Sequence, residues 1–119
     1  MEKKTIGFIG LGIMGYPMLG HLIKAGYPAV CYDVVPAAVE RGVGLGAKAA
    51  KSAQELAGQV DIVITMVPDS PDVEAAYLGE QGVLAGVRPG TLLLDMSTIS
   101  PITAQKVAKA AAAKGCAML

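Results

Sequence analysis

The sequence is poor in aromatic residues, carries no net charge and lacks a long apolar segment. It contains one Phe, four Tyr and no Trp, and its ten basic side chains balance ten acidic ones. Nucleic-acid interfaces need clustered positive charge and aromatic rings that stack on bases, so the composition excludes that class of partner. No apolar run reaches the about 18 residues of a membrane span, so we expect no membrane partner either.

Cysteines and metal-binding patterns are also scarce. The two cysteines, Cys31 and Cys116, lie in separate apolar segments and form no CxxC pair. Three carboxylates at the ends of apolar runs, Asp33, Asp69 and Asp95, have no D-x-D spacing, so we expect no metal site. The N-terminal residues lead directly into an apolar strand, without the features of a signal peptide, and the expected location is cytoplasmic.

What the sequence does have is small and branched aliphatic residues punctuated by glycine. The chain has 119 residues, of which 53% are hydrophobic and 15 are Gly, and its mean hydropathy is +0.51. This length suits one domain, residues 1–119, and the apolar content excludes disorder.

Short apolar runs alternate along the chain with segments of helical periodicity. Strands are expected at residues 5–9, 29–32, 47–50, 61–67, 91–94 and 116–119, and helices at 14–25, 36–41, 53–57, 70–78 and 101–114. This alternation predicts an α/β fold, a doubly wound and mostly parallel sheet with helices on both faces. The last expected strand is followed by no turn, so we interpret the chain as a domain truncated at its C-terminal end.

The strongest motif lies between the first strand and the first helix. It has the form G-x-G-x-x-G, in which the first glycine permits a tight turn, the second lets a pyrophosphate approach the backbone, and the third lets the helix pack on the strand. The amino end of the following helix favours phosphate. The predicted phosphate-binding residues are Gly10, Leu11, Gly12, Ile13, Met14 and Gly15.

An acidic residue follows the second strand at the position expected for ribose binding. Asp33 lies 18 residues after Gly15, where a carboxylate can accept hydrogen bonds from the ribose hydroxyls and repel a 2′-phosphate. The next residues, Val34 to Pro36, supply no cation for such a phosphate. The pattern therefore favours NAD over NADP. The alternative interpretation is a turn aspartate without a ligand.

Two further loops follow strands at the edge where ligands bind to such sheets. In the first, Pro68 stiffens the turn and is expected to leave the backbone groups of Met66 and Val67 free for a cofactor; the alternative is a turn that leads to a helix cap at Ser70. In the second loop, Ser97 and Thr98 are expected to present free hydroxyl groups.

Other reactive side chains receive no chemical role. His21, the only histidine, lies on the first helix and away from the glycine-rich loop, so no acid–base function is expected. The six methionines are scattered along the sequence and are interpreted as core filler. No catalytic residue is assigned to the chain.

Three segments in order resemble the β-hydroxyacid dehydrogenases. They are residues 6–18 (Ile-Gly-Phe-Ile-Gly-Leu-Gly-Ile-Met-Gly-Tyr-Pro-Met), residues 61–70 (Asp-Ile-Val-Ile-Thr-Met-Val-Pro-Asp-Ser) and residues 94–101 (Leu-Asp-Met-Ser-Thr-Ile-Ser-Pro). The family includes 3-hydroxyisobutyrate dehydrogenase and tartronate semialdehyde reductase, with 6-phosphogluconate dehydrogenase more distant. Two departures are His21, where the family commonly has Asn, and Val34, near which NADP-using members carry Arg.

The resemblance implies a Rossmann-type NAD-binding domain of an oxidoreductase. The whole enzyme is expected to exchange a hydride between NAD and a β-hydroxy acid or its semialdehyde, with Met66, Val67 and Pro68 lining the cofactor and Ser97 or Thr98 near the nicotinamide. The family's substrate motif, catalytic Lys and all-helical C-terminal domain would follow Leu119, so these 119 residues alone are expected to be inactive. Homo-oligomers would form through that missing domain. Two alternatives stay open: a free-standing nucleotide-binding module and an imine reductase-like protein.

Overall fold

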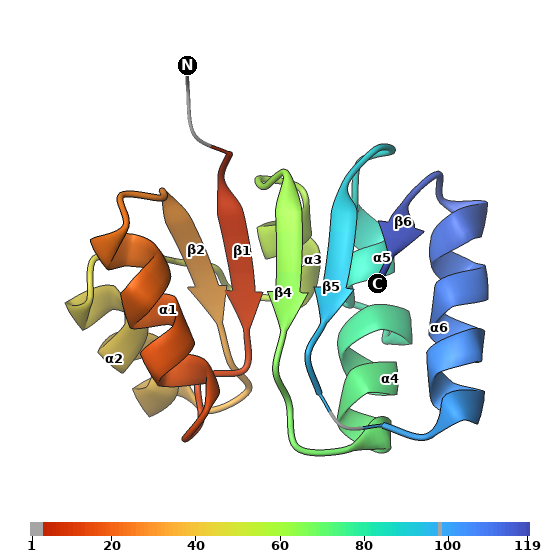
Figure 1. Cartoon of the computed structure of the whole chain (residues 1–119), viewed down its shortest axis with the longest axis horizontal. Coiled ribbons are helices and arrows are strands. Elements are labelled where there is room, and N and C mark those ends of the chain that lie inside the picture. The colour runs from red at the N-terminus through yellow and green to blue at the C-terminus, as the bar shows by residue number, and fades with distance from the viewer. Residues whose placement is uncertain (1–3, 98) are drawn as a thin grey trace.

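The computed structural model describes residues 4–97 and 99–119 and contains one parallel sheet. Its six strands have the order β3-β2-β1-β4-β5-β6 (Figure 1). The strands are β1 (Ile6–Ile9), β2 (Ala29–Tyr32), β3 (Lys48–Ala49), β4 (Ile62–Thr65), β5 (Leu92–Asp95) and β6 (Ala117–Met118). The helices are α1 (Gly15–Lys24), α2 (Pro36–Gly44), α3 (Ala53–Ala57), α4 (Ser70–Leu78), α5 (Val83–Gly86) and α6 (Pro101–Ala113).

Helices cover the sheet on both faces, and two separate apolar clusters form the core. On one face, Phe8 of β1 and Cys31 of β2 pack with Leu19 of α1 and Ala38 of α2. On the other face, the cluster joins the sheet to α3, α4, α5 and α6. The chain changes sides between β3 and β4, and β4 then pairs with β1. The expected doubly wound α/β fold is therefore confirmed.

A glycine in β1 lets a helix approach the sheet closely. Gly7 faces α3, and a Cβ built at this position would overlap the side chain of Leu56, which is fully buried. Close helix–strand packing of this kind is one reason why glycine occurs inside a buried strand.

Several element boundaries differ from those expected. Helix α2 extends three residues beyond the expected end at residue 41, and α5, a helix of four residues, was not expected. The first turn of α4 is capped by Asp69, whose carboxylate accepts the amide hydrogen of Ser70 at 2.8 Å, so the expectation of a cap at Ser70 was wrong. Ser70 instead uses its hydroxyl to accept the amide hydrogen of Ser100 at 2.9 Å.

Helix α1 starts one residue later than the expected start at residue 14. Gly15 and Leu19 are its buried residues, whereas Met14 precedes the helix and is mostly exposed. Ser52 and Ser100 cap α3 and α6: Ser52 accepts the amide hydrogen of Glu55, and Ser100 accepts that of Thr103.

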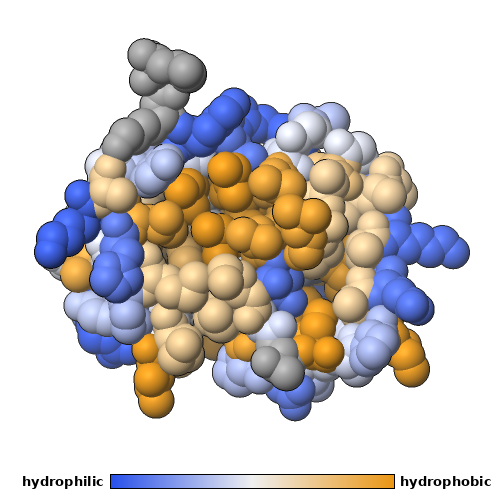
Figure 2. Space-filling view, viewed as in Figure 1, coloured by the Kyte–Doolittle hydropathy of each residue, from blue (hydrophilic) through white to orange (hydrophobic). Residues whose placement is uncertain are grey.

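One part of the sheet surface has no helix over it. Figure 2 shows an apolar area in the middle of the face that is viewed in Figure 1. The half-buried side chains of Ile62 and Leu94, from β4 and β5, pack at the edge of the α1-side cluster. Within the described part of the chain, no helix is long and apolar enough to cross a membrane.

Candidate cofactor-binding site

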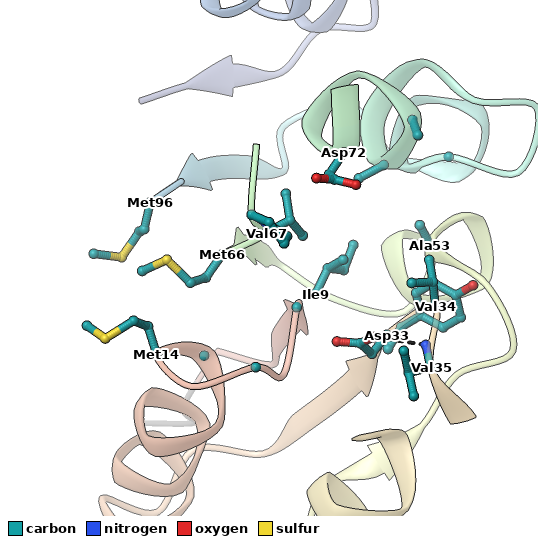
Figure 3. Close-up of a pocket in the computed structure, with 18 of the residues that line it drawn as sticks. Ile9, Met14, Asp33, Val34, Val35, Ala53, Met66, Val67, Asp72 and Met96 are labelled. Carbon is teal, nitrogen blue, oxygen red and sulfur yellow. Dashed lines mark hydrogen bonds between the residues drawn. The ribbon is translucent and has the colours of Figure 1, made fainter. Parts of the chain in front are cut away.

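A cavity lies at the carboxyl ends of the strands, where the chain leaves β1, β2, β4 and β5. It has a volume of about 700 Å³ and lies across the point where β1 and β4 diverge to opposite sides (Figure 3). Parallel α/β sheets bind their ligands at this switch point. It is lined by Gly10, Gly12, Ile13, Met14, Gly15, Asp33, Met66, Val67, Pro68 and Met96, among others. Most of the residues expected at the site are therefore brought together.

Two glycines of the first loop are required by the packing of the backbone itself. Gly10 has a φ of +99°, and a Cβ there would overlap the carbonyl oxygen of Met66 in the next loop. A Cβ on Gly15 would overlap the carbonyl oxygen of Gly10, which explains how α1 starts so close to the end of β1. These two positions set the path of the loop whether or not a ligand is bound.

Gly12, the middle glycine, is not required by the fold. A Cβ added to Gly12 would meet no atom within 4 Å, and its φ is not positive. Next to it, the amide groups of Ile13 and Met14 donate to no group among the described residues. Open space beside unpaired amides at the start of a helix fits a bound phosphate. The residues present therefore fit the pyrophosphate of a dinucleotide.

Leu11 contributes to this loop in a way that the motif does not indicate. Its side chain is fully buried in the core and does not line the cavity. Its amide donates to Asp33 Oδ2 at 2.7 Å, so this amide is not available to a phosphate. This hydrogen bond ties the loop to the end of β2, and contact of Leu11 with the cofactor stays a prediction.

Asp33 is half-buried at the end of β2 and lines the cavity. Its second oxygen, Oδ1, accepts the amide hydrogen of Val35 at 2.9 Å (dashed line in Figure 3). A carboxylate oxygen has two acceptor positions, so each oxygen retains one for a ligand. The ribose-binding role of Asp33 stays a prediction, and the geometry leaves room for it.

The loop after β4 is less free than expected. The amide of Met66 donates to the carbonyl of Ile9 at 2.9 Å, and that of Val67 donates to Ser97 Oγ at 2.8 Å. The expectation that the backbone groups of Met66 and Val67 are free for a cofactor therefore fails for the two amides. Their side chains and Pro68 do line the cavity.

The same contact corrects the expectation for Ser97. Its hydroxyl is not free but accepts the Val67 amide hydrogen, and the residue does not line the cavity directly. Thr98, the second hydroxyl expected here, lies outside the described residues.

A buried hydrogen-bond chain lies directly behind these loops. Thr65 Oγ1 is 2.9 Å from the hydroxyl of Tyr77 and donates to Asp95 Oδ1 at 2.7 Å. Thr65 and Tyr77 are fully buried, and burial raises the pKa of the Tyr77 phenol well above its ordinary value. The amide of Ser97 donates to the same Asp95 oxygen at 3.2 Å. Sequence reasoning missed Tyr77 and Thr65, because only the register of β4 against β5 places Thr65 opposite Asp95.

Three methionines line the cavity; Met14 and Met66 were expected at the cofactor site, whereas Met96 was interpreted only as core filler. Met14, Met66 and Met96 come from three different loops, and Figure 3 shows their side chains extending on the same side of the cavity. Met18 and Met118 do pack against the core clusters. Because a thioether side chain is flexible and polarizable, these residues form an adaptable apolar wall.

The charges that line the cavity have one sign. Asp33 and Asp72 both line it, and among the described residues no Lys, Arg or His does so. Asp72, in the first turn of α4, was missed because nothing in the sequence indicates that this turn reaches the cavity. Within the described ranges, no group of three His, Cys, Asp or Glu side chains could hold a metal ion.

Comparison with known proteins identifies the family. Residues 5–119 match the family described as the NAD binding domain of 6-phosphogluconate dehydrogenase. The chain belongs to this family of NAD-binding domains. Its cofactor is accordingly NAD, as the sequence predicted.

Curated relatives of this NAD-binding domain include two Pseudomonas aeruginosa enzymes. The chain is 49% identical to an NAD-dependent L-serine dehydrogenase over 98% of its length, and 48% identical to a 3-hydroxyisobutyrate dehydrogenase over 96%. It spans 39% and 38% of those two proteins. The resemblance to 3-hydroxyisobutyrate dehydrogenases is therefore confirmed over the matched residues.

Solved structures agree with this assignment. The domain superposes on Mycobacterium tuberculosis 3-hydroxyisobutyrate dehydrogenase, described with L-serine, with a TM-score of 0.91 and 38% identity, over 98% of this chain and 39% of that one. An imine reductase variant from Myxococcus stipitatus in complex with NAD⁺ gives a TM-score of 0.82 at 26% identity, over 98% of this chain and 39% of that one.

Proposed function

We propose that the cavity binds NAD in an extended form across the sheet. The adenosine ribose lies at Asp33, the pyrophosphate lies over Gly12 and the amides of Ile13 and Met14, and the nicotinamide lies toward the loops after β4 and β5. The observation that carries this proposal is Gly12, whose missing side chain leaves open space that the fold itself does not need.

The strand order supports the two ends of this arrangement. Asp33 follows β2, whereas Met96 and Ser97 follow β5, and the order β2-β1-β4-β5 separates them by three strand spacings. At about 4.8 Å per spacing, this is roughly 14 Å, which suits a dinucleotide lying across the switch point between β1 and β4. The methionine wall is at the end away from Asp33.

The lining charges favour NAD over NADP. The 2′-phosphate of NADP would approach Asp33, and no described cationic side chain lines the cavity to offset the repulsion. Asp72 adds a second negative charge to the lining. Ribose hydroxyls, in contrast, can donate to the free acceptor positions of Asp33.

For the whole protein, we propose dehydrogenation of a β-hydroxy acid. When bound, NAD⁺ accepts a hydride, and the substrate carbinol gives up that hydride and a proton to become the semialdehyde. The names of the relatives contain L-serine and 3-hydroxyisobutyrate, which are both 3-hydroxypropanoates and differ in the C2 substituent, an amino group in the first and a methyl group in the second. The residues of this chain bind and orient the cofactor, and no general acid or base is assigned among them. Inactivity of these residues alone and a cytoplasmic location stay predictions.

The first experiment is a titration of the 119-residue chain with NAD⁺, NADP⁺ and AMP by calorimetry. The proposal predicts saturable binding of NAD⁺ that is at least about tenfold tighter than binding of NADP⁺, or about 1.4 kcal/mol. No binding of NAD⁺ at millimolar concentration would contradict it.

A chimera tests the reaction. The chain replaces the matching part of the Pseudomonas aeruginosa 3-hydroxyisobutyrate dehydrogenase, to which it is 48% identical. We expect NAD-dependent turnover of 3-hydroxyisobutyrate, with the native enzyme as a control for the remaining part. A folded chimera that binds NAD but shows no turnover would favour the alternative of a binding module without catalysis.

A further inference from the structure

The hydrogen bonds behind the β4 and β5 loops have a defined direction. Asp95 carries a carboxylate, which only accepts, so the hydroxyl proton of Thr65 points to Asp95 Oδ1. Thr65 therefore accepts from the Tyr77 hydroxyl, and the chain runs from Tyr77 through Thr65 to Asp95. Hydrogen bonds that end on a charged acceptor are the stronger class.

This chain connects to both loops at the cavity. Asp95 Oδ1 also accepts the amide hydrogen of Ser97, and Ser97 Oγ accepts the amide hydrogen of Val67. Tyr77 of α4 thus fixes Asp95, Asp95 fixes the backbone of Ser97, and Ser97 fixes the loop that contains Val67. The loops after β4 and β5 behave as one hydrogen-bonded unit.

The unit leaves one donor unused. Ser97 accepts from Val67 through its oxygen, but its own hydroxyl proton has no acceptor among the described residues. Asp95 Oδ2 likewise has no described partner. Ser97 itself does not line the cavity, but both its neighbour Met96 and its partner Val67 do, so the position of Ser97 sets the position of two lining residues.

We propose that Tyr77, Thr65 and Asp95 are positioning residues, which hold Ser97 and Val67 in place for the nicotinamide end of bound NAD. They do not touch the cofactor themselves. The inference rests on the proposed function, because it needs the nicotinamide to lie toward β5. A purely structural role is the competing explanation, since a buried hydrogen-bond chain also stabilises the fold.

Two ligands separate positioning from stability. NADH carries the nicotinamide, whereas ADP-ribose has the same adenosine and pyrophosphate but no nicotinamide ring. A positioning role predicts weaker binding of NADH with unchanged binding of ADP-ribose. Loss of stability alone affects both ligands equally.

Thr65→Val removes the central hydroxyl with little change of shape. We expect it to weaken NADH binding by about tenfold and to change ADP-ribose binding by less than about twofold. Thr65→Ser keeps the hydroxyl and is expected to restore NADH affinity. Thr91→Val is the matched control. Thr91 is also buried and donates to the carbonyl of Arg88 at 2.8 Å, but it lies at the amino end of β5, away from the cavity at the carboxyl ends of the strands.

The fluorescence of bound NADH provides a second readout. With the loops fixed, the nicotinamide is held in one environment, so Thr65→Val is expected to shift the emission of saturated protein toward that of free NADH. If Thr65→Val does not fold, Tyr77→Phe carries the same comparison, because it removes only the terminal hydroxyl of the chain.

If Thr65→Val loses affinity equally for NADH and ADP-ribose, or loses affinity for neither ligand, the positioning role is overturned. A similar selective loss in Thr91→Val also overturns it, because that variant leaves the chain intact. If the unaltered protein binds neither ligand, the proposed function itself fails. If it binds both and the variants do not discriminate between them, only this inference fails.

Discussion

The loop after β1 and the pair of loops after β4 and β5 shape the same cavity by different means. The first is shaped by the absence of side chains: Gly10 and Gly15 allow backbone contacts that no other residue permits. The second pair is shaped by side chains, through hydrogen bonds of Thr65, Asp95 and Ser97. The carboxyl edge of one sheet thus combines a tightly packed backbone turn with a hydrogen-bond network that connects segments distant in sequence.

The largest effect is expected where the first loop is most tightly packed. Gly15→Ala places a methyl group against the carbonyl oxygen of Gly10, and neither backbone segment can move independently. We expect a loss of about 3 kcal/mol or more in the free energy of unfolding, at the upper end for overpacking. Urea denaturation measures it. Gly44→Ala, in open space within α2, is the control and should be neutral or slightly stabilising.

Gly12→Ala separates ligand binding from folding in the same loop. Because the added methyl group meets no protein atom, the free energy of unfolding should change by less than about 0.5 kcal/mol. NAD⁺ affinity should nevertheless fall by at least about tenfold, because the methyl group occupies the space of the pyrophosphate. Calorimetry and urea denaturation of the same sample test both parts. Unchanged NAD⁺ affinity would remove the main support for the phosphate position.

Asp33→Asn tests the link between the first loop and β2. The NAD⁺ preference over NADP⁺ should narrow by several-fold up to about tenfold, since a charged hydrogen-bond acceptor contributes about 1.5–3 kcal/mol. Adding Val34→Arg should narrow it further or reverse it. Asp72→Asn, which neutralises the other lining carboxylate, is the control and should have a smaller effect. Equal affinity of the unaltered protein for both cofactors would show that Asp33 is only a turn residue.

The smallest effect concerns Tyr77, behind the loops after β4 and β5, and changes the free energy of unfolding only at alkaline pH. Burial raises the pKa of Tyr77, so the unfolded chain releases this proton at a pH where the folded chain retains it. Stability is therefore fully present below about pH 10 and falls as the pH rises, by roughly 1 kcal/mol near pH 10.5. Tyr77→Phe should show a smaller fall than the unaltered protein in urea denaturation across this range. An identical pH dependence in both proteins would contradict the assignment to Tyr77.

The loop after β1 was predictable from sequence because its glycine spacing is local. Elsewhere in the chain, the helix caps Ser52 and Ser100 and the alternation of strands and helices also depend on neighbouring residues. Helix α5 escaped prediction because its four residues, Val83–Gly86, are too few to show a period. At the start of α4, Asp69 and Ser70 are both good capping residues, and a tertiary contact from Ser100 engages Ser70 elsewhere.

The contacts of the loops after β4 and β5 were not predictable from sequence, because they depend on the register of the strands. Ser97 and Val67 are 30 positions apart in the sequence, as are Thr65 and Asp95. Sequence reasoning expected a free hydroxyl at Ser97 but could not tell that its oxygen accepts the amide hydrogen of Val67. The same limit explains why Met96 was interpreted as core filler. It lies beside Met66 at the cavity only because β4 pairs with β5.

The two buried cysteines give each face of the sheet its own chemical reporter. Cys31 lies in the cluster under α1 and α2, Cys116 lies in the cluster under the remaining helices, and both are free thiols. Burial raises the pKa of Cys31, so its reactive thiolate is disfavoured in the folded protein. A thiol reagent added to the native protein therefore reacts when a face opens, and its rate at each cysteine measures the opening of that face. Without any engineered label, the two rates would show whether the two faces of the sheet open together or separately.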